Sequence, residues 1–308
     1  MSSGECAASR AVEAPRVLLG IGLGVFAALI WGGYFAMSRA GVQAGLTPAD
    51  VVLVRFAVAG ALTAPWLLRA GLRDLGGVGW GRGALLAMLI GPLSIFASVG
   101  GYTFAPMAHG TVIQPATVTL CALGASAFLL GESVGRGQVL GVGLIVLGLA
   151  GIAGPGVAQG DVSALPGDAL FVLAGLMWSG FTLLTKAWRL SPMQATAAVS
   201  VLSAAAYVPY HLSVDTLGRL AGLPWEMLLG QILVQGVLAG VAAVLAFTRA
   251  LEILGAGRAG VFTALVPGCG VLIGVPLTGE APGALQIAGL ALVSFGLLWV
   301  LGILKLRR

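Results

Sequence analysis

Ten apolar segments, each about twenty residues long, occupy almost the whole sequence, and charged residues, prolines or clustered glycines separate them. A helix needs roughly 20 apolar residues to cross the ~30 Å hydrocarbon core of a bilayer, because each residue advances the helix by about 1.5 Å. We therefore predict ten membrane-spanning helices, at 17–37, 48–68, 84–104, 111–130, 137–156, 167–186, 193–212, 227–249, 258–278 and 284–304.

The low charge of the chain excludes the ordinary soluble classes. Of its 308 residues, 58% are hydrophobic and only 9% are charged, whereas a soluble domain carries about 25% charged residues. The bilayer is therefore the expected solvent of this chain. Ten spans and their loops account for its length, which argues against an enzyme domain on a membrane anchor.

The basic residues predict the orientation of the helices. If the N-terminus is cytoplasmic and the spans alternate, thirteen of the sixteen basic residues fall on the cytoplasmic side, and only Arg39 and Arg219 fall outside, with Arg55 inside a span. This asymmetry follows the positive-inside rule. We predict two cytoplasmic termini, a tail at 1–16 and a basic tail at 305–308. Because the basic residues are spread over many loops, we expect no nucleic-acid partner.

The two halves of the chain resemble each other. Four groups of residues recur in the same order, at offsets between 144 and 148. The matches are Trp31-Gly32-Gly33-Tyr34 with Trp178-Ser179-Gly180-Phe181, Thr47-Pro48 with Ser191-Pro192, Leu130-Gly131-Glu132 with Thr278-Gly279-Glu280, and Gln138, Gly141 and Gly148 with Gln286, Gly289 and Gly296.

Five spans in each half make the repeat inverted, because an odd number of crossings brings the second half into the membrane from the opposite side. Arg39, in Ser38-Arg39-Ala40, is then outside, while its counterpart Lys186, in the matching Thr185-Lys186-Ala187, is inside. Likewise, Glu132 is inside while Glu280 is outside. The predicted fold class is an all-α membrane protein with ten transmembrane helices as two inverted five-helix repeats, at 17–156 and 157–304. Such repeats allow two nearly equivalent packings, one open to each side, which is the architecture of alternating access.

These motifs resemble the drug/metabolite transporter superfamily, in its ten-helix, EamA-like branch. The resemblance rests on the Trp-Gly-Gly and Trp-Ser-Gly stretches at 31–33 and 178–180 and on the two Gly-Glu endings at 131–132 and 279–280, and it covers about 17–304. In the second half Pro267 precedes Glu280 by the spacing usual in that family, but Thr119 occupies the equivalent position of the first half, with Pro115 nearby. The chain is most similar to bacterial amino acid exporters, which implies a bacterial inner (plasma) membrane protein with a small-molecule substrate and no cofactor.

Polar and aromatic side chains inside spans mark a candidate substrate cavity, because polar groups in hydrocarbon are costly and usually face protein or water. The candidates are Trp31, Tyr34, Ser94, Ser98, Tyr102, Gln114, Thr117, Trp178, Phe181, Phe247 and Pro267. Each has a structural alternative. The aromatic residues could belong to the interfacial belt, the Ser94–Ser98–Tyr102 stripe could bond a neighbouring helix, and Pro267 could simply bend its helix.

Ionisable residues inside the membrane are few. The acidic residues lie near helix ends or in loops, and Arg55 either pairs with Asp50 or neutralises an anionic substrate. Because no carboxylate or histidine is expected at the midplane, we predict facilitated diffusion. Cys6, Cys121 and Cys269 are far apart, so neither a disulfide nor a metal site is predicted.

The sequence thus predicts a transporter that works by alternating access and exports amino acids, including aromatic ones. Two alternatives stay open: a carrier of another metabolite, by uptake or with proton coupling, and a non-transporting membrane enzyme. Metalloprotease, nucleophile-elbow and P-loop patterns are absent from the sequence, which disfavours an enzyme. A structural or assembly protein is a third class, and it predicts no solvated cavity. The sequence leaves monomer and homodimer equally open.

Overall fold

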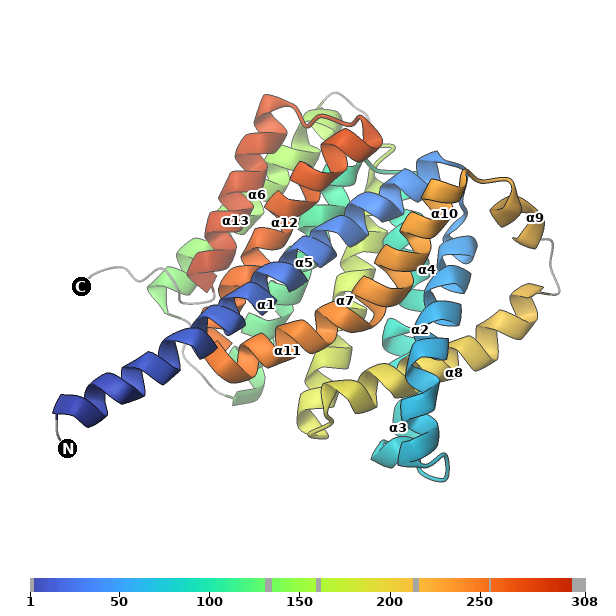
Figure 1. Cartoon of the computed structure of the whole chain (residues 1–308). Coiled ribbons are helices and arrows are strands. Elements are labelled where there is room, and N and C mark those ends of the chain that lie inside the picture. Colours follow the sequence, from blue (N-terminus) through green and yellow to red (C-terminus); the bar gives the residue numbers. More distant parts are fainter. Residues whose placement is uncertain (1–2, 131–134, 159–161, 213–215, 255, 301–308) are drawn as a thin grey trace.

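Helices make up nearly all of the computed structural model, which describes residues 3–130, 135–158, 162–212, 216–254 and 256–300 (Figure 1). In chain order they are α1 (Ser3–Gln43), α2 (Pro48–Ala70), η1 (Leu75–Gly77), α3 (Trp80–Ile90), α4 (Pro92–Gly100), η2 (Gly101–Thr103), α5 (Met107–Leu130), α6 (Arg136–Ala158), α7 (Leu165–Ala187), α8 (Pro192–Leu212), α9 (Thr216–Ala221), α10 (Trp225–Gln231), the π-helix η3 (Ile232–Ala242), α11 (Ala243–Leu254), α12 (Ala256–Thr278) and α13 (Ala284–Val300).

The ten predicted spans are confirmed in the described part of the chain. The third span consists of α3, α4 and η2, the eighth consists of α10, η3 and α11, and each of the others is one helix. Five spans are by themselves long and apolar enough to cross a bilayer: Pro15–Gln43, Pro48–Ala70, Trp80–Thr103, Leu165–Ala187 and Trp225–Leu254. The fold is therefore that of a multi-pass helical membrane protein.

Two spans are less regular than the sequence predicts. The third is broken between α3 and α4, where Gly91 has a ψ of −146° and Pro92 lacks an N–H. A side chain at Gly91 would strike the Ala87 carbonyl and the Ser203 hydroxyl. The eighth span is π-helical in its middle, a geometry that is uncommon and is often found at functional sites.

The two halves begin equivalent helices with equivalent caps. Thr47 Oγ1 accepts from the Asp50 N–H at 3.3 Å ahead of α2, and Ser191 Oγ accepts from the Gln194 N–H at 3.3 Å ahead of α8. In the first turns of α6 and α13, Gln138 and Gln286 accept the N–H groups of Gly135 and Gly283, which precede these helices, at 2.9 and 3.0 Å. Such caps satisfy backbone groups that the first turn leaves free. The sequence repeat is therefore also a repeat of local structure.

Packing follows the same two-fold relation. Helices α2 and α8, which are counterparts, pack on each other, as do the counterparts α6 and α13 (Figure 1). Helix α1 packs on α12 and α11, and its counterpart α7 packs correspondingly on α5 and α4. Each half thus contributes helices to the same central interface.

Four glycines bring α6 and α13 into backbone contact. A Cβ at Gly148 would lie 2.6 Å from the Gly289 carbonyl oxygen, and a Cβ at Gly289 would lie 2.6 Å from that of Gly148. Gly141 and Gly296 form the same reciprocal pair at 2.7 Å. Such close approach is typical of helix pairs in membranes, where small residues at the interface allow extensive van der Waals contact.

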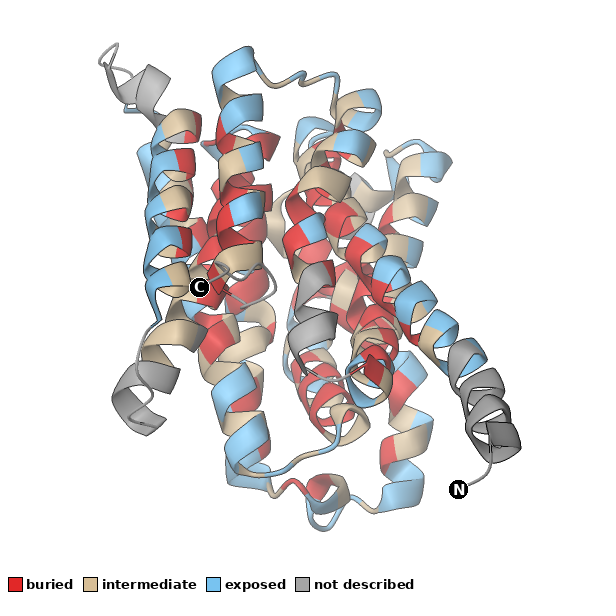
Figure 2. Cartoon of the chain, turned by 90° about the vertical axis from the view of Figure 1, so that its left-hand side faces the viewer, coloured by how far each residue is buried: buried red, intermediate tan, exposed pale blue. Residues whose placement is uncertain are grey.

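Burial is distributed as a bilayer requires. The outward faces of the helices are exposed while buried residues gather between them (Figure 2), and large apolar side chains such as Leu68, Met88 and Leu272 lie on the outside. Several polar side chains are enclosed instead, among them Ser38 and Gln235. Because hydrocarbon offers polar groups no partners, they are retained where neighbouring helices supply hydrogen bonds.

Candidate functional site

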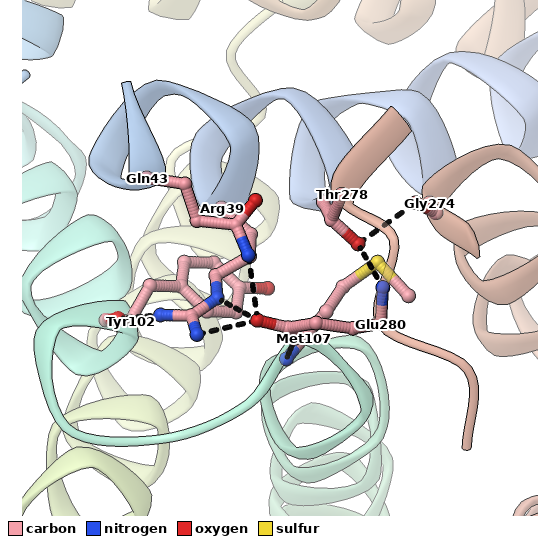
Figure 3. A network of polar contacts seen from close by, with 7 residues as sticks. All are labelled: Arg39, Gln43, Tyr102, Met107, Gly274, Thr278 and Glu280. Atoms are coloured by element: carbon pink, nitrogen blue, oxygen red, sulfur yellow. Dashed lines mark hydrogen bonds and ion pairs between the residues drawn. The ribbon is translucent and has the colours of Figure 1, made fainter. Parts of the chain in front are cut away.

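An ion pair lies at one end of the bundle, here named the Arg39 end, where α1 and α12 end and α2, α5 and α13 begin. Arg39 on α1 donates through Nε to Oε1 of Glu280, which follows α12, at 2.6 Å (Figure 3). Gln43, one turn further along α1, donates to the same oxygen at 2.8 Å. The contact joins the first half of the chain to the second.

The same carboxylate also holds the start of α5. Glu280 Oε2 accepts the Met107 N–H at 2.9 Å, and the Arg39 guanidinium donates in addition to the Tyr102 carbonyl (Figure 3). Glu280 is itself oriented by a 3.2 Å bond from its N–H to Thr278 Oγ1. One side chain therefore ties together α1, the η2–α5 connection and the α12–α13 connection.

The opposite end has no equivalent ion pair in the described residues. Lys186, the counterpart of Arg39, is exposed near the end of α7 and forms no hydrogen bond or ion pair within that part of the chain. Glu132, the counterpart of Glu280, lies outside the described residues. The repeat is thus symmetric in sequence, while the Arg39 end carries a contact that Lys186 does not make with any described residue.

Three of the predicted cavity residues form a hydrogen-bonded chain within the bundle. The Tyr34 hydroxyl, on α1, donates to Ser98 Oγ, on α4, at 2.9 Å. Ser98 donates in turn to Gln114 Oε1, on α5, at 2.9 Å. Tyr34 precedes Arg39 by five residues, or about 7.5 Å of helix, so this chain lies deeper than the Arg39–Glu280 ion pair.

Arg55 lies beside this chain and makes a second set of polar contacts. Its guanidinium sits over the Tyr34 ring, 5.4 Å from the centroid, and its Nη1 is 3.5 Å from Gln235 Oε1 on η3. Gln235 then donates to Ser38 Oγ at 2.9 Å. We name Tyr34, Ser38, Arg55, Ser98, Gln114 and Gln235 the Arg55 cluster.

Arg55 was predicted either to pair with Asp50 or to neutralise an anionic substrate. The structure shows no ion pair between Arg55 and Asp50. Instead, the Asp50 carboxylate accepts the Thr47 N–H at 2.9 Å and the Thr47 hydroxyl at 2.7 Å, which completes the capping box of α2. The other contacts of Arg55 are with an aromatic ring and a neutral carboxamide. Its positive charge therefore has no carboxylate partner in the described residues.

The predicted aromatic residues form two separate pairs. Trp31, one turn before Tyr34 on α1, packs on Phe247 of α11, with 5.0 Å between the ring centroids. Trp178 and Phe181, both on α7, have ring centroids 6.0 Å apart. Trp31 and Phe247 come from different halves and border the Arg55 cluster along α1, whereas Phe181 packs against the apolar core that α2 and α8 share.

The other predicted residues serve packing in this conformation. Tyr102 is fully buried against Phe171, and its hydroxyl has no partner in the described part of the chain, so a cavity role for it stays a prediction that requires another packing. Thr117 donates to the Ile113 carbonyl of its own helix at 2.8 Å. Ser94 is buried on α4, and Pro267 lies inside α12, which continues through it.

Some residues of the site are absent from the sequence prediction. Gln231 and Gln235 are fully buried on one face of the eighth span, and two carboxamides four residues apart in an apolar segment were a usable signal. Ser38 lies one turn from Tyr34, but its partner on η3 depends on the tertiary fold. His109 and Asp168 form a further pair, with Nδ1 2.7 Å from Oδ1, between the starts of α5 and α7.

The site offers hydrogen-bond donors and aromatic surface rather than metal ligands. Among the described residues, no three His, Cys, Asp or Glu side chains gather where they could hold a metal ion. The Arg55 cluster presents one cation, hydroxyls and carboxamides between α1, α2, α4, α5 and η3. Such a set can bind and orient a small polar solute.

Comparison with known proteins agrees with this architecture. The model of the EamA-like transporter family matches the chain twice, over residues 18–154 and 165–302. No curated protein sequence matches significantly. A crystal structure of a protein with 18% sequence identity is similar over 94% of this chain and 97% of the other, with a TM-score of 0.59. At that identity the likeness concerns the fold alone.

Proposed function

Because the chain belongs to the EamA-like transporter family, within the drug/metabolite transporter superfamily, we propose that it carries small metabolites across the membrane by alternating access. The Arg39–Glu280 closure is the observation that carries this proposal. It joins the two halves at one end of the bundle, while the equivalent Lys186 is unpaired within the described residues. An inverted repeat closed by such a contact at one end can adopt the related packing that closes the other.

The proposed substrates are amino acids, including aromatic ones. The Trp31–Phe247 pair supplies aromatic surface beside the polar groups of the Arg55 cluster. A phosphate-rich solute would require several cations within the membrane, and Arg55 is the one basic side chain of this cluster. A small zwitterion with an apolar side chain suits both features.

The proposed location is the bacterial inner membrane, with both termini in the cytoplasm. The distribution of Lys and Arg supports this orientation, which places the Arg39 end outside. The conformation with Arg39 bound to Glu280 is then closed to the outside. Export follows when a substrate loaded from the cytoplasm is released through that end.

Facilitated diffusion is the proposed energetics, and proton-coupled transport is the second candidate. In the described spans, the acidic residues lie in the first or last turns, as Asp50, Asp168 and Glu252 do, which supports an uncoupled carrier. The buried His109–Asp168 pair favours the second candidate, because proton relays in membrane transporters are built from histidine and carboxylate side chains.

Flux into vesicles tests both. Purified protein in liposomes is expected to give saturable uptake of labelled phenylalanine and leucine, with unlabelled amino acids competing and protein-free liposomes as the control. Uptake that stops when internal and external concentrations are equal supports facilitated diffusion. Accumulation of substrate driven by a pH gradient alone would reject facilitated diffusion and support proton coupling. Absence of flux for every amino acid would reject the proposed substrates.

A further inference from the structure

Arg55 is a cation inside a membrane span that has no carboxylate partner among the described residues. It lies seven residues after Pro48, the first residue of α2, which places it about 10 Å of helix from that end. Within the described residues it forms no salt bridge, and its one protein hydrogen bond is the 3.5 Å contact with Gln235. Arginine at such depth usually pairs with a carboxylate or faces a water-filled cavity, because an isolated charge is costly there.

The remaining donors of this guanidinium have no protein partner in the described residues. A guanidinium has five N–H donors, and Arg55 uses one of them weakly on Gln235. Its other side-chain nitrogens are not fully enclosed by protein, and the residue as a whole is only partly buried. These nitrogens are therefore left without a protein acceptor in the described residues and can donate to a ligand that reaches the cluster.

Gln114 offers a second free donor on the same cluster. Its Oε1 is occupied by Ser98 at 2.9 Å, which leaves the amide nitrogen without a protein acceptor in the described residues. That nitrogen, too, is not fully enclosed. Because the Tyr34 ring lies beneath Arg55 and the Tyr34 hydroxyl reaches Ser98, one chain of contacts fixes both donors.

We propose that the Arg55 cluster binds the carboxylate of the transported solute, with Arg55 as its anchor and Gln114 as a second donor. This inference rests on the proposed transport function and narrows its substrates to monocarboxylates, amino acids among them. The planar guanidinium matches a carboxylate with two parallel hydrogen bonds. With Tyr34 on one face, the free N–H edges of Arg55 are those that such a bidentate contact uses.

A purely structural Arg55 would behave differently. If Arg55 only contacted the Tyr34 ring and Gln235, it would stabilise the packing of α1, α2 and η3. It would then not favour the binding of one ligand over another. A ligand anchor instead discriminates between solutes with and without a carboxylate. The test therefore compares ligands as well as variants.

The experiment measures binding of three probes to the full chain in lipid nanodiscs by calorimetry. L-phenylalanine and phenylacetate carry a carboxylate, and phenethylamine does not. The variants are Arg55→Gln, Arg55→Lys and, as the matched control, Arg69→Gln, which removes the same charge from an exposed position on the same helix. Gel filtration verifies that each variant is folded.

We expect wild type and Arg69→Gln to bind both carboxylates at least about tenfold more tightly than phenethylamine, since a hydrogen-bonded ion pair contributes on the order of a tenfold change or more. Arg55→Gln should abolish this difference. Arg55→Lys keeps the positive charge at this position but loses the bidentate geometry. It should reduce the difference in affinity between the carboxylates and phenethylamine severalfold. If Arg55→Gln does not fold, the lysine variant decides.

Three results would overturn the inference: no binding of phenylacetate and L-phenylalanine by the wild type, equal losses for all three probes in Arg55→Gln, or a lysine variant that is indistinguishable from wild type. Vesicle flux separates this failure from failure of the proposed function. Amino acid flux that persists in Arg55→Gln keeps the transporter and rejects the anchor. Arg55-dependent binding of phenylacetate without amino acid flux keeps the anchor and rejects the proposed amino acid substrates.

Discussion

Arg39 and Glu280 lie 241 positions apart in the sequence, and the Nε atom of one is 2.6 Å from Oε1 of the other. Their side chains keep only 20% and 26% of their surface exposed, so the pair is shielded from water more than an ordinary surface ion pair. Because the same carboxylate also binds the Met107 N–H, rupture of this contact removes the polar link between α1, the start of α5 and the α12–α13 connection at this end of the bundle.

Glu280→Gln should therefore open the Arg39 end. The amide keeps the shape of the side chain but loses the charge-assisted bonds to Arg39, at a cost of about 1–3 kcal/mol. Ser98, deeper in the bundle, should become accessible. In a background without native cysteines, we expect Ser98→Cys to react at least about fivefold faster with a membrane-impermeant thiol reagent when Glu280→Gln is present, as a shift of about 1 kcal/mol requires.

The matched control is Glu252→Gln. Glu252 pairs with Arg249 at 2.6 Å, but both side chains are more than half exposed, and such surface pairs contribute little. This variant should leave the labelling rate of Ser98→Cys unchanged. Equal rates in the Glu280→Gln protein and its parent would mean that the ion pair does not hold this end closed.

Gly148→Val tests the interface between the two halves. A Cβ at this position would lie 2.6 Å from the Gly289 carbonyl oxygen, so α6 and α13 must separate to accept it. Overpacking of this kind costs about 1–3 kcal/mol. We expect a clearly lower midpoint of thermal unfolding in detergent, measured by tryptophan fluorescence.

Gly143→Val provides the comparison on the same helix. A Cβ at Gly143 would meet nothing within 4 Å, and the propensity cost of valine in a helix is common to both variants. The midpoint for Gly143→Val should stay near that of wild type. Similar losses in the two variants would show that helix propensity, not the α6–α13 contact, limits stability.

The sequence predicts the helices and the repeat well because both depend on local signals. The length of the apolar runs marks the spans, and Thr47 and Ser191 precede helices in equivalent places because each can cap one. The inversion follows from counting alone. The breaks within spans are harder to predict: the sequence does not specify that Gly91 approaches Ser203 of α8 so closely that a side chain would not fit there, and the π-helical η3 has no distinctive composition.

The candidate site is predicted in part. Tyr34, Ser98 and Gln114 are polar or aromatic residues in apolar segments, and the structure joins them in one chain. Their connection to Arg55 through the Tyr34 ring depends on how α1 and α2 pack, which periodicity does not specify. Arg39 and Glu280 were predicted on the same side of the membrane, but only the fold determines that they are neighbours.

Asp168→Asn should destabilise the Arg39 end near α7. The carboxylate lies 2.7 Å from His109 Nδ1, both side chains are largely buried, and Asp168 lies in the first turn of α7, where a negative charge is favourable. Loss of a buried hydrogen bond to a charged group costs about 1–3 kcal/mol. Thermal unfolding in detergent should show a lower midpoint. Asp74→Asn, at an exposed position whose side chain caps no helix, should leave the midpoint unchanged.

A double-mutant cycle between Tyr34 and Arg55 measures how far the aromatic ring supports the cation. The guanidinium lies 5.4 Å from the ring centroid, a geometry that contributes about 0.5–2 kcal/mol in a poorly solvated site. Tyr34→Phe keeps the ring and loses the hydroxyl bond to Ser98, whereas Tyr34→Leu loses both. Denaturant titrations in mixed micelles give the free energy of unfolding of each variant.

The difference between Tyr34→Leu and Tyr34→Phe isolates the ring from the hydroxyl. In the wild-type background this difference should include the cation–π energy, and in the Arg55→Gln background it should be smaller by about 0.5–2 kcal/mol. Equal differences in the two backgrounds would mean that the ring packs against α2 without holding the guanidinium. The free donors of Arg55 would then be positioned by Gln235 alone, and Gln235→Leu would become the variant that displaces them.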